Sequence, residues 1–185
     1  RQFDIPVIGV IEPGARRGVA VTRSGRIGVI GTEGTIRSSA YTKAMKRLDP
    51  RVEVLAKACP LFVPLAEEGW TDNEVARMCA ETYLRELREE GVDTLVLGCT
   101  HYPLLKGTIA RVMGDGVTLV DSAEETARTV AAVLGERGLL RPEREKGNHH
   151  FLVTDVPAGF VRVANRFLGE ALEDVHQVSV EEKSE

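Results

Sequence analysis

A cysteine and a histidine lie two residues apart in the stretch Leu97-Gly98-Cys99-Thr100-His101-Tyr102-Pro103. The apolar run before them predicts a buried strand over 93–97, and Pro103 favours a helix that begins just after the stretch. Amide N–H groups and the helix dipole at such a start lower a thiol pKa. We therefore expect Cys99 to ionise, His101 to carry protons and Thr100 to bind a carboxylate. The alternative is a packed cysteine beside a capping histidine.

A second loop of this kind, Gly31-Thr32-Glu33-Gly34-Thr35, follows the predicted strand 26–30. Its two threonine hydroxyls and the amide groups of a helix start could hold a carboxylate or a phosphate. The same residues would also make a tight turn with a threonine cap. No lysine follows the glycines, which excludes a P-loop, and 28–31 does not fit the dinucleotide-binding pattern G-x-G-x-x-G.

The chain has three cysteines without a C-x-x-C pair, which argues against a disulfide framework and favours a reducing cytoplasm. Cys79 lies on the apolar face of a predicted helix, so we expect it in the core. Cys59 has no histidine or hydroxyl residue nearby, which favours packing as well. A zinc site would lack the usual close ligand spacing, and its candidate ligands are Cys59, Cys99, His101 and His149 or His150. We therefore expect no metal.

The composition is that of a globular protein, with 185 residues, 43% hydrophobic and 28% charged. This length allows one sizeable core or two small lobes. The net charge of -4 disfavours nucleic acid and anionic lipid as partners. Apolar runs fall short of the ~20 residues of a membrane span, and no leader is recognisable, so we expect a cytoplasmic protein.

Strand and helix patterns alternate along the chain, which is typical of an α/β fold with a parallel sheet and ligands at the carboxyl ends of the strands. The expected strands are 5–11, closed by a turn at 12–14, then 26–30, 52–55, 93–97, 117–120, 151–154 and 175–180. The expected helices are 36–48, 71–91, 103–113, 122–137 and 160–168. Capping boxes at 71–74 and 122–125 begin two of them. The apolar face of 71–91 is predicted to comprise Val75, Met78, Cys79, Tyr83, Leu84 and Leu87. The charged stretch 141–148 is predicted to be a surface connection, with His149 and His150 facing solvent or at the start of a strand.

The stretch Gly98-Cys-Thr-His-Tyr-Pro-Leu-Leu105 resembles the signature around the second catalytic cysteine of the glutamate racemases. Further similar segments follow the family's order, namely 5–14, 31–35, 58–63 with Glu67, and 167–169. The resemblance spans essentially all 185 residues. It implies a cofactor-independent amino-acid racemase that supplies D-glutamate for peptidoglycan synthesis. The implied fold has two pseudo-symmetric three-layer α/β lobes with mainly parallel sheets, and the active site lies between the lobes.

Carried over by position, the resemblance makes Cys99 one of two catalytic thiols and His101 the residue that assists it. Glu67 matches an acidic residue that the family places near the active site. Cys59 falls in a segment that is not catalytic in the family. The substrate-binding side comprises Thr100, Thr32 and Thr35.

The chain departs from the family pattern because neither the Asp-Ser-Gly turn nor the Cys-Asn-Thr motif of the first catalytic cysteine occurs. By the resemblance, residues 1–13 and 122–185 belong to the first lobe, which is incomplete, and residues 14–121 form the second. We therefore expect a fragment that is inactive alone. A homodimer is a further expectation.

Inversion of Cα without a cofactor needs an acid/base group on each face of the carbon. Glutamate is the small-molecule substrate that the Thr-His-Tyr-Pro run after Cys99 favours. The alternatives are a related two-cysteine isomerase acting on aspartate or hydantoins, and a non-catalytic module that binds a carboxylate or a protein.

Overall fold

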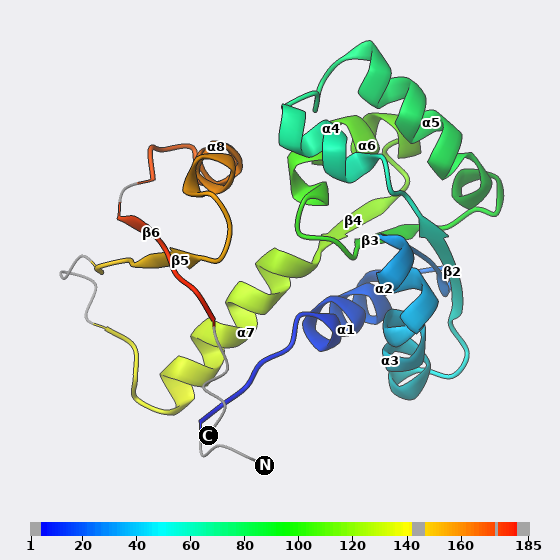
Figure 1. Cartoon of the computed structure of the whole chain (residues 1–185). Helices are drawn as coiled ribbons and strands as arrows, with labels where there is room; N and C mark the ends of the chain where they lie inside the picture. Colours follow the sequence, from blue (N-terminus) through cyan, green and yellow to red (C-terminus); the bar gives the residue numbers. More distant parts are fainter. Residues whose placement is uncertain (1–4, 142–146, 173, 181–185) are drawn as a thin grey trace. The chain divides into compact units, whose positions relative to one another are not determined.

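The computed structural model describes residues 5–141, 147–172 and 174–180. The chain divides into two compact units, residues 1–140 and 141–185, whose elements are labelled in Figure 1. The larger unit contains both loops for which the sequence predicts reactive or ligand-binding side chains, residues 31–35 and 97–103. The lobe boundaries at residues 13 and 121 remain a prediction.

The larger unit is built on a four-stranded parallel sheet in the order β2-β1-β3-β4. β3 is buried at every position, as its uninterrupted apolar sequence predicts. The alternation of strands and helices thus produces the expected α/β fold with a parallel sheet. The bounds are β1 Arg26–Gly31, β2 Glu53–Ala58, β3 Thr94–Leu97 and β4 Thr118–Asp121.

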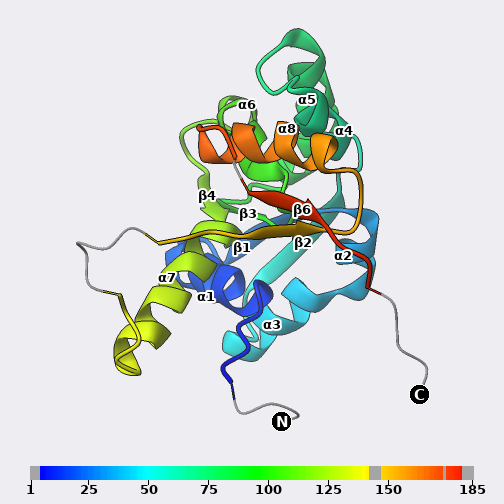
Figure 2. The ribbon, with the colours of Figure 1, turned by 60° about the vertical axis from the view of Figure 1, so that its left-hand side comes forward.

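Helices cover both faces of this sheet, as Figure 2 shows. α1 (Ile11–Val21) and α3 (Ala40–Leu48) pack on the face that presents Ile27 and Val29, and α7 (Ser122–Glu136) packs against α1. The opposite face presents Ile30 and Leu97 to α4 (Phe62–Glu68), α5 (Glu74–Glu89) and α6 (Lys106–Met113). Two shorter helices, α2 (Glu33–Ser38) and the 3-10 helix η1 (Tyr102–Leu105), begin near the carboxyl ends of β1 and β3.

β1 and β3 are neighbours whose following helices lie on opposite faces. The connection from β1 contains α3, whereas the connection from β3 contains α6. Adjacent strands whose connections diverge in this way form the crevice in which open α/β sheets bind ligands. This switch point lies between the loops that begin at Thr32 and Gly98.

The strand expected over 5–11 is absent. Residues 5–10 have no regular structure, and Ile11 begins α1, so the expected turn at 12–14 is the first turn of that helix. Proline is compatible with a first helical turn. Ile5 and Val7 are 65% and 82% exposed, because no strand of the described residues pairs with this segment. A β-branched run alone does not make a buried strand.

The helix expected over 36–48 is two helices, because Ser39 adopts a left-handed conformation with a φ of 54° and separates α2 from α3. Both expected capping boxes are wrong by one or two residues. Asn73 caps α5 and Asp121 caps α7, each accepting a bond from an amide within the first turn. The expected apolar face of α5 is partly wrong, since Val75 and Met78 are exposed and Ala76 and Ala80 are buried instead.

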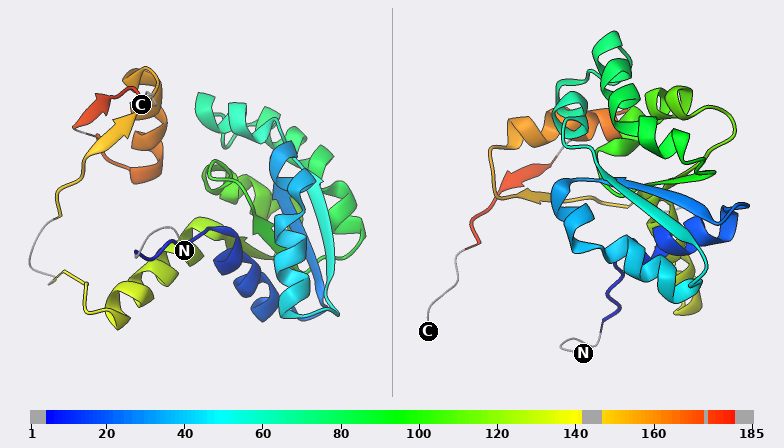
Figure 3. Two further views of the ribbon diagram at one scale, coloured as in Figure 1. Left: turned by 60° about the horizontal axis from the view of Figure 1, so that its bottom comes forward. Right: turned by 90° about the vertical axis from the view of Figure 1, so that its right-hand side faces the viewer.

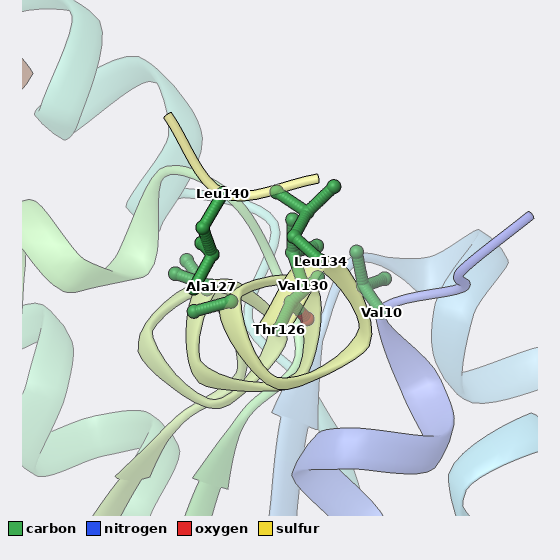
Figure 4. A pocket seen from close by; sticks show the side chains of 8 residues that line it. Val10, Thr126, Ala127, Val130, Leu134 and Leu140 are labelled. Carbon is green, nitrogen blue, oxygen red and sulfur yellow. The ribbon is translucent and has the colours of Figure 1, made fainter. Parts of the chain in front are cut away.

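Apolar side chains also line a hollow of about 500 Å³ on α7, seen from close by in Figure 4. Val130 and Leu134 of the helix lie there with Val10 and Leu140. The helix is amphipathic, yet Ser122 at its start is its one buried residue. Its apolar stripe therefore remains largely open in the larger unit.

The smaller unit contains a parallel pair of strands, β5 (Phe151–Val153) and β6 (Val175–Gln177), with α8 (Pro157–Leu168) between them in sequence (Figure 3). Gly169 ends α8 in the left-handed conformation. His149 and His150 are exposed, as predicted. The expected connection over 141–148 falls mostly on residues outside the described ranges.

Candidate active site

The carboxyl ends of β1 and β3 lie close together because β1 ends in Gly31 and Gly98 directly follows β3. The amide of Gly98 donates a hydrogen bond of 2.7 Å to the carbonyl of Ile30. A Cβ at Gly98 would lie 2.9 Å from that same oxygen, and one at Gly31 would lie 3.3 Å from the Gly98 carbonyl. Only glycine allows this approach, which brings the two predicted loops to one place.

Cys99 is half-buried beyond the end of β3, where it packs against the core and also lies near polar side chains. Its Sγ lies 4.0 Å from Nδ1 of His101, and Oγ1 of Thr100 lies 3.4 Å from the same nitrogen. The amide of Tyr102 donates to the Cys99 carbonyl at 3.2 Å, which begins η1. Thiol, hydroxyl and imidazole therefore form one cluster, as the spacing of these residues predicts.

Glu67 joins this cluster from α4. Its Oε1 lies 3.3 Å from Nε2 of His101, so the carboxylate contacts one ring nitrogen while the other faces the thiol. A carboxylate on one nitrogen fixes the orientation and the tautomer of an imidazole. The acidic residue that the resemblance identifies is thus in place to orient His101.

Burial raises the pKa of the Cys99 thiol, which contradicts the expected lowering. The amides of His101 and Tyr102 and the Thr100 hydroxyl act in the opposite direction, but burial has the larger effect. The reason is that a short 3-10 helix offers few amide groups, while the protein around the sulfur removes water. The thiol is consequently protonated at neutral pH.

The threonine loop serves as a helix cap. Thr32 caps α2 by accepting from the Thr35 amide at 3.4 Å, and the two hydroxyl oxygens lie 3.1 Å apart. Both side chains are half-buried. The predicted cap is confirmed, and binding of a carboxylate by the two hydroxyls remains a prediction.

The other two cysteines lie outside this cluster. Cys59 is fully buried at the end of β2, where burial raises the pKa of its thiol to about 12, which confirms the packing prediction. Cys79 is half-buried at the margin of the core on α5, rather than fully inside it. Among the described residues no group of three His, Cys, Asp or Glu side chains could hold a metal ion. Neither do the described helices include one long and apolar enough to cross a membrane.

The sequence interpretation missed two side chains next to the cluster. Tyr41 of α3 is 4% exposed, and its phenol donates a hydrogen bond of 2.9 Å to Oγ of Ser122, which is 6% exposed. The sequence places Ser122 directly after a predicted strand, which could have indicated a site residue, but a polar residue at that position also fits a helix cap.

Comparison with known proteins supports the resemblance. Residues 1–130 match the family model described as Asp/Glu/Hydantoin racemase. A glutamate racemase of Geobacter metallireducens is 72% identical over 99% of this chain, which covers 68% of that relative.

Solved structures agree with this match. A glutamate racemase isoform of Bacillus anthracis, RacE1, superposes with a TM-score of 0.89 at 41% identity, over 97% of this chain and 66% of that one. Glutamate racemase of Francisella tularensis, solved in complex with D-glutamate, gives a TM-score of 0.86 at 33% identity, over 95% of this chain and 65% of that one. The chain thus spans about two thirds of the length of these relatives, and it belongs to the Asp/Glu/hydantoin racemase family.

Proposed function

We propose that this chain provides one side of the active site of a glutamate racemase, which interconverts L- and D-glutamate without a cofactor. The observation that carries the proposal is the cluster of Cys99, His101 and Glu67 near the carboxyl ends of the neighbouring strands β1 and β3. Support for the substrate comes from the Francisella relative, which was solved in complex with D-glutamate.

Cys99 acts as the proton donor or acceptor on one face of Cα. Because its thiol is protonated at neutral pH, it first donates its proton to the carbanion formed when a base on the opposite face removes the α-proton. The Cα–H bond on one side breaks, a new one forms on the other, and Cys99 is left as a thiolate. In the reverse direction this thiolate removes the proton.

His101 assists the proton transfer, with Glu67 behind it. The imidazole lies beside the sulfur, so it stabilises the thiolate and exchanges its proton with solvent. Thr100, Thr32 and Thr35 bind the carboxylates of the substrate. Hydroxyl and amide donors there stabilise the charge that builds up on the α-carboxylate.

The second base is not one of the other thiols. Cys59 is buried and Cys79 lies on α5, so Cys99 is the one cysteine of the chain at this site. A second acid/base group therefore has to come from residues other than these three cysteines, which fits the proposed two-lobed enzyme. We further propose a cytoplasmic location, a homodimer as its assembly, and D-glutamate supply for peptidoglycan as its role.

The test measures two reactions of the protein, at whatever length its gene encodes, with each enantiomer of glutamate. Interconversion is followed by polarimetry, and washout of the α-proton in D2O by NMR. Cys99→Ala should abolish interconversion in both directions and retain proton exchange with one enantiomer. Cys59→Ala is the matched control and should retain both reactions.

Interconversion by Cys99→Ala at a substantial fraction of the parent rate would refute the assignment of Cys99. Turnover of aspartate in preference to glutamate would refute the substrate. Racemisation by the 185-residue chain alone, well above the Cys99→Ala background, would show that these residues already contain both bases.

A further inference from the structure

A buried hydrogen bond lies directly behind the Cys99 loop. Tyr41, near the start of α3, donates its phenol proton to Oγ of Ser122, the first residue of α7. The two residues are 81 positions apart, and both side chains are almost fully buried. A buried hydroxyl pair fixes its surroundings strongly, because either group would lose its partner if it moved.

Two glycines close the space around this pair. A Cβ at Gly14 of α1 would lie 2.5 Å from Oγ of Ser122, and a Cβ at Gly98 would lie 2.9 Å from Cε2 of the Tyr41 ring. The ring therefore packs against the backbone of Gly98 on one side, and its hydroxyl is held at the junction of α1 and α7.

Gly98 is the residue before Cys99, so the phenol ring supports the peptide that carries the thiol. The electrostatic relation agrees with this packing. Burial raises the pKa of Tyr41, the hydrogen bond with Ser122 offsets part of this rise, and negative charge on Cys99 raises the pKa further. The phenol therefore stays protonated and keeps its bond to Ser122 when Cys99 becomes a thiolate.

We propose that Tyr41, held by Ser122, is a positioning residue that fixes the Gly98–Cys99 turn and thereby sets the burial and direction of the Cys99 thiol. The proposal rests on the proposed function only in giving that thiol a catalytic role. It concerns how the chain's own backbone is held, and it needs no substrate to be tested.

Several ionisable groups act on the thiol and have to be separated from this effect. His101 lies on the same loop, and Glu67 of α4 reaches the thiol through His101. A thiolate at Cys99 also raises the pKa of Tyr102, the residue that begins η1. The variants must therefore leave these three residues unchanged.

The experiment measures the rate at which iodoacetamide alkylates Cys99 as a function of pH, with peptide mapping to separate the three cysteines. Tyr41→Phe removes the hydroxyl and keeps the ring. We expect the turn to loosen and the thiol to gain water, so the midpoint of the profile falls and alkylation near neutral pH rises about threefold. Alkylation of Cys79 in the same sample should not change.

Tyr83→Phe is the matched control, because it removes a phenol hydroxyl from α5, away from Gly98. It should leave the Cys99 profile unchanged. An unchanged or raised midpoint in Tyr41→Phe, or the same shift in Tyr83→Phe, would overturn the proposal.

Ser122→Ala removes the other partner and serves alone if Tyr41→Phe fails to fold. The double variant should shift the midpoint no further than either single variant, because both remove one hydrogen bond. Additive shifts would overturn the proposal. In the active enzyme both variants should lower kcat with little change in KM. If Cys99→Ala abolishes racemisation but Tyr41→Phe leaves the alkylation profile of Cys99 unchanged, the positioning role is refuted and the proposed function stands. If Cys99→Ala still racemises glutamate at the parent rate, the proposed function is refuted.

Discussion

The two ends of β3 are polar in different ways. Before the strand, Asp93 accepts four hydrogen bonds of 2.6 to 3.0 Å, from two hydroxyls and two amides of neighbouring residues. After the strand, the contacts of Cys99 and His101 are 3.3 to 4.0 Å long and join a thiol, a hydroxyl, an imidazole and a carboxylate.

The residue before β3 thus contributes to stability, and the residues after it carry the reactive groups, although the strand is only four residues long. The carboxylate of Asp93 ties the loop before β1 to β3, because its partners include Thr22, Arg23 and Ser24. Its hydrogen bonds hold its pKa well below the usual range, against the effect of burial. At the opposite end burial dominates and raises the pKa of Cys99. Substitutions before β3 should therefore lower stability and leave activity largely unchanged, whereas substitutions after β3 should lower activity and leave stability largely unchanged.

The largest expected effect is on activity, from His101→Asn. Loss of the imidazole should lower the racemisation rate by about 10²- to 10⁴-fold, the usual contribution of an acid/base group. The free energy of unfolding should change little, since His101 is only half-buried. Steady-state kinetics and urea unfolding of the same preparation test this, with Glu67→Gln as a milder companion variant. An unaltered rate would reduce His101 to a structural residue of the turn before η1.

Asp93→Asn should produce the reverse result. The side-chain amide keeps an oxygen for the amides of Arg23 and Ser24, but it loses the charge and its NH2 group cannot accept from the hydroxyls of Thr22 and Thr94, so the free energy of unfolding at pH 7 should fall by about 2 kcal/mol. Activity of the folded protein should stay within about threefold, because the residue lies at the far end of the strand. A loss of activity without a loss of stability would break the comparison.

The pH dependence gives a second measurement on the same variant. The pKa of Asp93 is lower in the folded protein than in the unfolded chain, so its contribution is present above the unfolded value, about 3.9, and is lost as the pH falls towards the folded value. The difference in stability between parent and Asp93→Asn should therefore shrink below about pH 4. A difference that is constant from pH 7 to pH 3 would contradict this.

The threonine loop should give a smaller effect on binding. Thr35→Val replaces a hydroxyl by a methyl group of similar shape, and should weaken glutamate binding by about 1.5–3 kcal/mol, or about 10- to 150-fold in KM. Thr32→Val should do the same and also cost about 1 kcal/mol of stability, because Thr32 caps α2. Thr32→Ser, which keeps the hydroxyl, is the control. Unchanged KM in both valine variants would remove the loop from the site.

The sequence was sufficient for the parts of the molecule that depend on local pattern. The apolar run before Gly98 predicted β3, and the spacing of Cys99 and His101 predicted their contact. Prediction from the sequence failed where contacts with residues distant in the chain determine the structure or the pKa. The β-branched run 5–11 needs a neighbouring strand, and the Cys99 pKa depends on how much protein surrounds the sulfur.

The pair Tyr41–Ser122 shows the same limit within the site. Nothing in the two local sequences indicates that they meet, since the sheet order β2-β1-β3-β4 alone brings α3 and the start of α7 together. Sheet order is a long-range property that one sequence does not reveal. A residue that supports a functional loop from behind is therefore harder to predict than one within the loop.

The smallest expected effect is that of Cys59→Ala. This variant tests whether the difference between the two ends of β3 is a property of the whole carboxyl edge of the sheet or of each residue's own surroundings. Cys59 lies at the same carboxyl edge as Cys99, but its thiol is inside the core and its carbonyl accepts from the Tyr102 phenol at 2.8 Å. Cys59→Ala should cost about 1 kcal/mol of stability, through lost packing, and should leave racemisation within about twofold. Urea unfolding and the polarimetric assay give both numbers. A loss of activity near that of Cys99→Ala would show that the whole edge acts as one unit, and that burial does not separate a structural cysteine from a catalytic one.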